Sequence, residues 1–308
     1  MTGGSRHPQG PRRPPRALGS RLQYAVFELL VRCRALPLAR ALLIVVVLYY
    51  TLLPGVRQRS AAYIRRRFPQ AGPFERFAHA YRLYLQFGLV LLDRMVAGCT
   101  GRFPLCITTP EIRARMDHAL NNPQGCIVLT AHMGAWQVGL AGLQRCGRNL
   151  HVLQAHAPKA ADRHYFELGQ GRPFHIIDAA EGPASLVEAA TALRRGEVLC
   201  LMGDRMPEVA PHLAGQSVVV PFLNGEIALP ITAYALAFIT KASLLMLLTV
   251  HERGATRALW AEEVVVPAGL NRRRPEDFAP YARRFAHGME SMARQYPYQF
   301  FNFYDIWL

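Results

Sequence analysis

The sequence predicts an α/β fold, with a mainly parallel or mixed sheet flanked by helices and an N-terminal helical segment attached to a membrane. The sheet is predicted because short apolar runs alternate with helical stretches from residue 125 onward, which is typical of strands covered by helices. The attachment is predicted because a charge-free apolar stretch, 41–53, lies between arginine-rich flanks. We therefore expect a disordered basic tail at 1–21, a membrane-associated helical segment at 22–56 and one α/β domain at 57–308.

Composition and charge narrow the class of protein. Of the 308 residues, 51% are hydrophobic and 19% are charged, which is too apolar for a disordered chain and too mixed for a polytopic transporter. The 36 basic residues exceed the 21 acidic ones by 15, which suits anionic lipids, nucleic acid or an acidic protein partner. We expect no nucleic-acid partner, because no zinc-finger spacing, RNP-like aromatic pattern or basic zipper is present.

The six cysteines indicate a reducing compartment. None forms a C-x-x-C pair, and several lie inside apolar runs, where cysteine acts as a small buried hydrophobe. We favour reduced thiols in a cytoplasmic setting, with neither a disulfide framework nor a metal site.

The apolar stretch near the N-terminus fits several placements. Its 13 charge-free residues, 41–53, are short for a span, and extending it back to Ala35 gives 19 residues with one charge, Arg40. A cleaved signal peptide is disfavoured because no A-x-A site follows. Three placements remain: a single span, an in-plane or re-entrant helix, and a buried core helix. The positive-inside rule does not distinguish a span from an in-plane helix here, because both flanks of the stretch are basic. We favour membrane attachment.

Residues 73–98 predict a long helix with a wide apolar face. Gly88 lies on that face and would let a neighbouring element approach closely. Such a helix either packs on the core or enters the membrane surface.

The second half of the chain alternates strands and helices. Apolar runs predict strands at 126–131, 150–155, 174–177, 198–203 and 217–222, and a late pair at 244–252 and 258–266. Helical spacing follows the first strand and recurs at 161–170, 185–196, 230–241 and 276–295. The aromatic tail, 300–307, is expected to pack in the core rather than hold a cofactor.

The turn after the first strand is the leading candidate site. Ligands of such sheets bind beyond the carboxyl ends of the strands, and this turn reads His132-Met133-Gly134-Ala135-Trp136-Gln137. Gly134 permits a tight turn, and His132 would present its imidazole above the sheet to accept a proton from a hydroxyl nucleophile. A hydrogen-bonded structural histidine is the competing interpretation.

Four motifs in order resemble the bacterial lysophospholipid and lipid A acyltransferase superfamily, particularly its late-acyltransferase branch. The first is the turn at His132, where the family pattern is a histidine, four intervening residues and then Asp or Glu; this chain keeps the histidine, Gly134 and Trp136 but has Gln137 in the place of the acid. The other three are Met202-Gly203-Asp204-Arg205, Val220-Pro221-Phe222-Leu223 followed by Pro230, and the tail 296–307. That tail is similar to the ending of predicted acyltransferases of aryl-polyene-type lipid pathways.

The resemblance implies a membrane-associated acyltransferase that moves an acyl group from acyl carrier protein or acyl-CoA to a lipid-like acceptor. His132 would be the general base, and Gln137 stands at the position of its acidic partner. Direct transfer needs no cofactor and no serine or cysteine nucleophile, and the sequence has no G-x-S-x-G elbow. The residues that would bind substrate are Gly134, Trp136, Asp204 and Arg205. A structural ion pair is the alternative for the last two.

The same resemblance implies the inner membrane as the location, with the catalytic domain facing the cytoplasm and anionic membrane lipids as partners. An acyl carrier protein is acidic and would be attracted to a chain of net charge +15.

Gln137 is the main departure from the family pattern. Its amide can accept a hydrogen bond from the histidine but supplies no negative charge, and in serine proteases an acid-to-amide change costs roughly 10⁴-fold. Three interpretations stay open: another acid replaces it, turnover is slow, or the chain is a degenerate relative that binds lipid or acyl carrier. The candidate acids are Asp204, Asp178 and Glu226. Lesser departures, where glycine is expected, are Asn224 and Thr232.

Overall fold

The computed structural model describes residues 19–101, 106–136, 143, 146–154, 174–206, 216–252, 255–265 and 274–308. Several predicted features lie outside the described residues: the tail before residue 19, most of the helical stretch after the first strand, Gln137 and the helix at 161–170.

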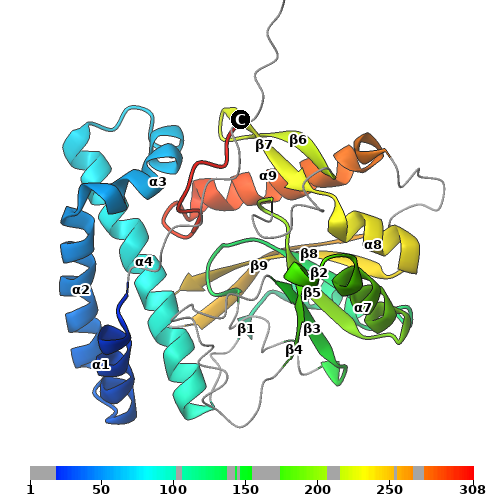
Figure 1. Cartoon of the computed structure of the whole chain (residues 1–308), viewed down its shortest axis with the longest axis horizontal. Helices are drawn as coiled ribbons and strands as arrows, with labels where there is room; N and C mark the ends of the chain where they lie inside the picture. The colour runs from blue at the N-terminus through cyan, green and yellow to red at the C-terminus, as the bar shows by residue number, and fades with distance from the viewer. Residues whose placement is uncertain are drawn as a thin grey trace, which may run out of the picture.

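A seven-stranded mixed sheet forms the centre of the α/β part, as the alternation of strands and helices predicts (Figure 1). Its strands are β1 (Cys106–Ile107), β2 (Cys126–Thr130), β3 (Leu150–Gln154), β4 (His175–Asp178), β5 (Val198–Met202), β8 (Ser243–Glu252) and β9 (Ala255–Val264). They are ordered β1-β9-β8-β2-β5-β3-β4. All neighbours are parallel except β8 and β9, which form the predicted late pair.

Helices cover both faces of this sheet. Successive side chains of a strand point to opposite faces, so Ile127 and Leu129 of β2 join one apolar cluster while Cys126 and Val128 join a second. Among the helices after residue 101, α7 (Pro183–Arg194), α8 (Thr232–Thr240) and α9 (Ala279–Gln295) contribute to the first cluster and α5 (Pro110–Leu120) to the second. Short 3-10 helices precede α7 (Ala179–Glu181) and α9 (Pro275–Phe278). Neither α5 nor β1 is among the predicted elements.

The predicted strand at 217–222 lies outside the main sheet. As β6 (Ser217–Phe222) it pairs antiparallel with β7 (Gly225–Pro230), a strand that the apolar pattern does not predict. The two loop residues, Leu223 and Asn224, have φ values of +47° and +58°, as a type I′ turn requires. Asparagine tolerates this left-handed conformation, which is a physical reason for Asn224 at a position where glycine is expected.

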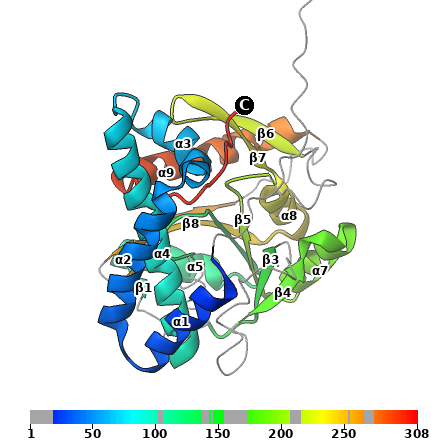
Figure 2. The ribbon, with the colours of Figure 1, turned by 60° about the vertical axis from the view of Figure 1, so that its left-hand side comes forward.

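Four helices form a layer beside the sheet: α1 (Arg21–Arg32), α2 (Leu36–Leu52), α3 (Pro54–Arg67) and α4 (Pro73–Thr100) (Figures 1 and 2). The predicted long helix is α4, and it contacts each of the other three. A Cβ atom on Gly88 would lie 2.8 Å from Leu43 Cδ1, so this glycine lets α2 pack closely on α4, as predicted.

Helix α4 is long and apolar enough to cross a membrane, and so are α2 and α3 together if the two count as one bent span. Half of the apolar window of α4 is buried inside the protein, and α2 and α3 are bent by 87° with respect to each other. Length and composition therefore leave the placement of these helices open.

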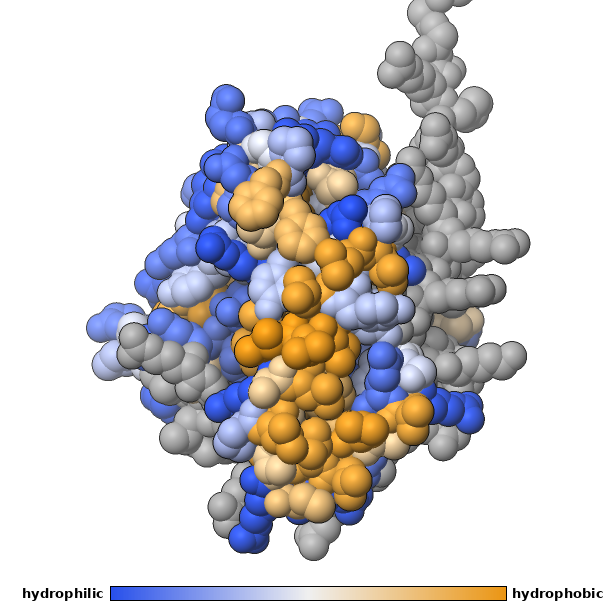
Figure 3. Space-filling model, turned by 90° about the vertical axis from the view of Figure 1, so that its left-hand side faces the viewer, coloured by the Kyte–Doolittle hydropathy of each residue, from blue (hydrophilic) through white to orange (hydrophobic). Residues whose placement is uncertain are grey.

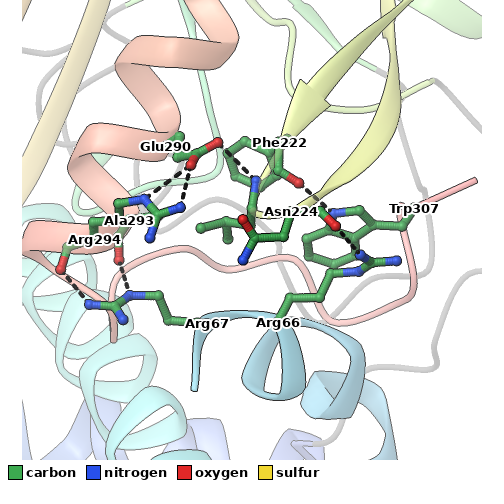
Figure 4. Close-up of polar contacts among 9 residues, drawn as sticks. Arg66, Arg67, Phe222, Asn224, Glu290, Ala293, Arg294 and Trp307 are labelled. Carbon is green, nitrogen blue, oxygen red and sulfur yellow. Dashed lines mark hydrogen bonds and ion pairs between the residues drawn. The ribbon is translucent and has the colours of Figure 1, made fainter. Parts of the chain in front are cut away.

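Two arginines at the end of α3 connect the helical layer to the α/β part (Figure 4). Arg66 Nη1 donates to the Asn224 carbonyl oxygen at 3.3 Å, and its guanidinium lies 4.9 Å from the centroid of the Trp307 ring. Arg67 donates to two carbonyl oxygens at the end of α9, at 3.1 and 2.6 Å. The β6–β7 hairpin and α9 thus both hold α3.

Candidate active site

The candidate site forms where β2 and β5 end side by side. The two strands are parallel, and their last residues, Thr130 and Met202, are paired in register. Gly203 continues the pairing, since its N–H donates to the Thr130 carbonyl oxygen at 2.9 Å. His132 and Asp204 each follow two residues after this pair, so the register brings them to the same edge of the sheet.

His132 and Asp204 are in direct contact. His132 Nδ1 lies 2.9 Å from Asp204 Oδ1 and 3.1 Å from Oδ2, so Nδ1–H donates to the carboxylate. The buried Oδ2 atom also accepts from Asn302 Nδ2 at 2.9 Å. Burial alone would raise the pKa of Asp204, but the charge and hydrogen bond of His132, with Arg205 and Asn302, hold that pKa well below its ordinary value. The carboxylate is therefore ionised at neutral pH.

Arg205 covers the other ring nitrogen of the histidine. Its Nη2 lies 2.7 Å from His132 Nε2, and because a guanidinium only donates, Nε2 carries the lone pair while Nδ1 carries the proton. Burial, together with the Arg205 charge, lowers the pKa of His132 against the opposing effect of Asp204. The imidazole is therefore neutral at pH 7, with the lone pair on the nitrogen that faces away from the acid.

The C-terminal segment forms one wall of the site. Two backbone hydrogen bonds of 3.0 and 2.7 Å join the turn at 132–134 to the tail at 299–301. Phe300 is fully buried, which confirms that the tail packs in the core. This pairing also carries Asn302 to the carboxylate of Asp204. Asn302 is not a predicted site residue, and the signal that could have found it is a polar residue inside an aromatic run.

Gly134 has a conformational reason for being glycine. Its φ is +53°, and a Cβ atom there would collide with the backbone of Thr249 and Val250 on β8. The glycine thus permits the turn that directs His132 over the sheet. Its role in substrate binding stays a prediction.

Trp136 also lies near the histidine, with its ring edge-on and the two ring centroids 6.4 Å apart. The position of Gln137, the predicted partner of His132, lies outside the described residues.

The three candidate acids have different surroundings. Asp204 contacts His132, as described above. Asp178 accepts a backbone N–H at 2.9 Å at the start of a short helix, and Glu226 is exposed on β7. Of these three acids, the structure brings Asp204 to the histidine.

A second histidine–carboxylate pair lies behind the same tail. His251 Nε2 lies 2.5 Å from Asp93 Oδ2, and the side chain of Gln299 exchanges two hydrogen bonds, of 2.6 and 2.7 Å, with the His251 backbone. These residues, with Arg40 and Gln86, line a cavity of about 770 Å³. The pair ties α4 to β8. In the described part of the chain, no three histidine, cysteine or acidic side chains gather as a metal site would require.

Comparisons with known proteins identify the family. Residues 113–308, well over half of the chain, match the family model of the bacterial lipid A biosynthesis acyltransferases. The comparison with curated proteins finds no match. The likeness of the tail to acyltransferases of aryl-polyene-type pathways stays a prediction. The matched region contains all of the residues that meet at His132. With a match of this length around that site, the chain belongs to the bacterial lipid A biosynthesis acyltransferase family.

Proposed function

We propose that the chain transfers an acyl group from acyl carrier protein or acyl-CoA to a hydroxyl or amino group of a lipid-like acceptor, with His132 as the general base. The observation that carries this proposal is the contact of His132 Nδ1 with both oxygens of the buried Asp204 carboxylate, at 2.9 and 3.1 Å. It fixes the tautomer, orients the ring and places a negative charge where an imidazolium would form. Family membership supports acyl transfer to a lipid-like acceptor.

In the proposed reaction, His132 Nε2 takes the proton of the acceptor hydroxyl while its oxygen attacks the thioester carbonyl carbon. The tetrahedral intermediate then collapses with cleavage of the C–S bond, and the imidazolium returns the proton to the departing thiolate. The acceptor gains an ester, or an amide where the nucleophile is an amine. The donor leaves as a free thiol, and no acyl-enzyme forms.

Arg205 leaves His132 Nε2 before the proton transfer. Its Nη2 occupies the lone pair of Nε2 at 2.7 Å, so the acceptor hydroxyl has to take its place. A planar guanidinium suits phosphate and carboxylate groups, and we assign Arg205 to an anionic group of the bound substrate. Gly134 and Trp136 remain proposed substrate-binding residues, because both belong to the turn that carries His132.

In this proposal Asp204 supplies the carboxylate that orients His132, a role for which the amide of Gln137 has no negative charge. A relative that only bound lipid would have no use for an ionised carboxylate buried beneath the histidine, because burial of a charge costs stability unless it is paired. The hydrogen bonds that His132 and Asn302 donate to the carboxylate offset that cost here. The arrangement therefore supports an enzyme over the binding-only alternative.

We also place the enzyme at the cytoplasmic face of the inner membrane, among anionic lipids. Exposed apolar side chains gather on α1 and α2 (Figure 3), and the chain has a net charge of +15. Among the side chains that the structure describes, Cys33, Cys99, Cys126, Cys146 and Cys200 are free thiols, which suits a reducing compartment.

The test is transfer of a labelled acyl group to total membrane lipid, from acyl carrier protein and from coenzyme A in parallel. Wild type should transfer label and His132→Ala should not. The control is His118→Ala, because His118 is an exposed histidine paired with Glu263 on β9. If the wild type folds, binds membranes and transfers label from neither donor, the binding-only alternative is correct.

A further inference from the structure

The outer side of α1 and α2 is an apolar band (Figure 3). We call it the α1–α2 face, and its members are the exposed side chains Leu22, Val26, Leu29, Leu38, Ile44, Val45, Leu48, Tyr49 and Leu52. Their exposed fractions run from 38% for Val26 to 74% for Leu22. Contiguous apolar surface of this kind marks a site that a membrane or another protein covers.

The opposite side of α2 is fixed to the protein. Its buried residues are four positions apart and therefore form one stripe: Ala39, Leu43, Val47 and Thr51. This stripe packs on α4, where Gly88 admits Leu43. Along its length, α2 is thus half protein interior and half exposed apolar surface.

If α2 crossed the membrane, α4 would also enter the bilayer, because the two helices pack against each other. Asp93 of α4 pairs with His251 of the central sheet, and His79 of α4 contacts the Tyr298 hydroxyl at 2.9 Å. Immersion of these polar groups in hydrocarbon would be costly. The 17 residues of α2 also reach only about 26 Å at 1.5 Å per residue, against roughly 30 Å of hydrocarbon.

The C-terminal end of α2 is capped by an arginine of the next helix. Arg57 Nη1 donates to the carbonyl oxygens of Thr51 and Leu52, at 2.6 and 2.8 Å. These are carbonyl groups that a helix end leaves without a partner. The next helix, α3, turns away by 87° and is held by the α/β part through Arg66 and Arg67. The polypeptide therefore returns to the protein at the point where a spanning helix would continue into the opposite leaflet.

The charges around the α1–α2 face match anionic headgroups. Residues 19–67 contain nine arginines and one acidic residue, Glu28. Arg21, Arg34 and Arg40 are exposed next to the apolar side chains. A basic amphipathic surface of this kind is typical of helices that lie in a membrane interface.

We propose that the α1–α2 face lies flat in the interface of an anionic bilayer, so that α2 runs parallel to the membrane surface and does not cross it. This inference rests on the membrane association included in the proposed function and specifies its geometry. Because α3 and α4 are fixed to the α/β part, this docking also fixes the orientation of the His132 site relative to the membrane.

Tryptophan scanning of the full-length chain tests the orientation. Leu38→Trp, Val45→Trp and Leu52→Trp are spaced by seven residues on one face, at 59, 63 and 57% exposure. Each is bound to phosphatidylglycerol–phosphatidylcholine vesicles whose acyl chains carry bromine at defined depths, and the fluorescence of the unsubstituted chain is subtracted. All three should be quenched at the same shallow depth. Val187→Trp is the matched control, since this α7 valine is 67% exposed and should stay unquenched.

The competing arrangements give different results. If α2 spans, position 45 is deepest and positions 38 and 52 are shallow, which overturns the proposal. Val45→Asp should weaken vesicle binding at least tenfold and Val187→Asp should not. A dimer in the absence of vesicles that Val45→Asp dissociates would assign the face to a second copy and overturn the proposal. If the wild type binds no vesicles, membrane association itself is refuted. The proposed reaction is tested separately, by transfer of the labelled acyl group to an acceptor dispersed in detergent.

Discussion

At the scale of single residues, the protonation of His132 determines when the site is active. Burial is the largest influence and lowers its pKa, Asp204 opposes it, and Arg205 adds to it. A general base acts when neutral, so activity is present above this pKa and is lost as the pH falls through it. We expect the acidic limb of the kcat/KM profile to lie below the ordinary value of 6.5.

Arg205→Gln should move this limb toward higher pH, because the substitution removes a cation that disfavours the imidazolium. The measurement is kcat/KM for the acyl donor between pH 5 and 9, in a buffer of constant ionic strength. An unshifted limb would mean that Arg205 does not contact His132 in the free enzyme.

The second prediction at the scale of single residues concerns the Asp204 carboxylate. Asp204→Asn keeps the shape of the side chain but removes the charge and permits the wrong tautomer, so we expect kcat to fall by roughly 10⁴, as for the comparable change in serine proteases. Circular dichroism and acceptor binding should change little. Asp178→Asn is the control, because this carboxylate lies away from His132 and caps the short 3-10 helix that follows β4. A loss of less than tenfold for Asp204→Asn would assign the acidic role to another group.

The same residues show how far sequence alone leads. His132 and Asp204 are predictable as site residues because each directly follows an apolar strand, where α/β proteins bind ligands. Their pairing is not, because it depends on the register of β2 with β5. Asn302 is not predictable either, because it reaches Asp204 only through the pairing of the tail with the turn, across 98 positions of sequence.

At the scale of elements, the contact of α2 with α4 depends on Gly88. A Cβ atom would lie 2.8 Å from Leu43 Cδ1, so Gly88→Leu forces the helices apart and should destabilise the protein by about 1–3 kcal/mol. Gly55→Ala on α3 has no atom within 4 Å of its Cβ position and should change stability by at most about 1 kcal/mol. Urea unfolding in mild detergent compares the two. Equal stabilities would mean that α2 is not packed on α4.

The hydropathy pattern identifies some strands of this fold and not others. The buried strands β2, β3 and β5 are continuous apolar runs, which hydropathy identifies as strands. It does not identify β7, which carries Gly225, Glu226 and Pro230 among its six residues. Its signal was local: the Asn-Gly pair at 224–225 is typical of a tight hairpin. Turn chemistry would have identified a strand that hydropathy did not.

At the scale of the whole molecule, net charge distinguishes the two donors. A chain of charge +15 attracts an acidic carrier protein over many contacts, and this attraction weakens as salt shortens the screening length from about 10 Å at 0.1 M to about 3 Å at 1 M. If the donor is acyl carrier protein, its KM should rise at least tenfold between 0.05 and 0.5 M NaCl with kcat nearly unchanged. An uncharged acyl-pantetheine is the control and should respond by less than twofold. A carrier-protein KM that salt does not change would remove charge as the basis of donor recognition and favour coenzyme A as the donor.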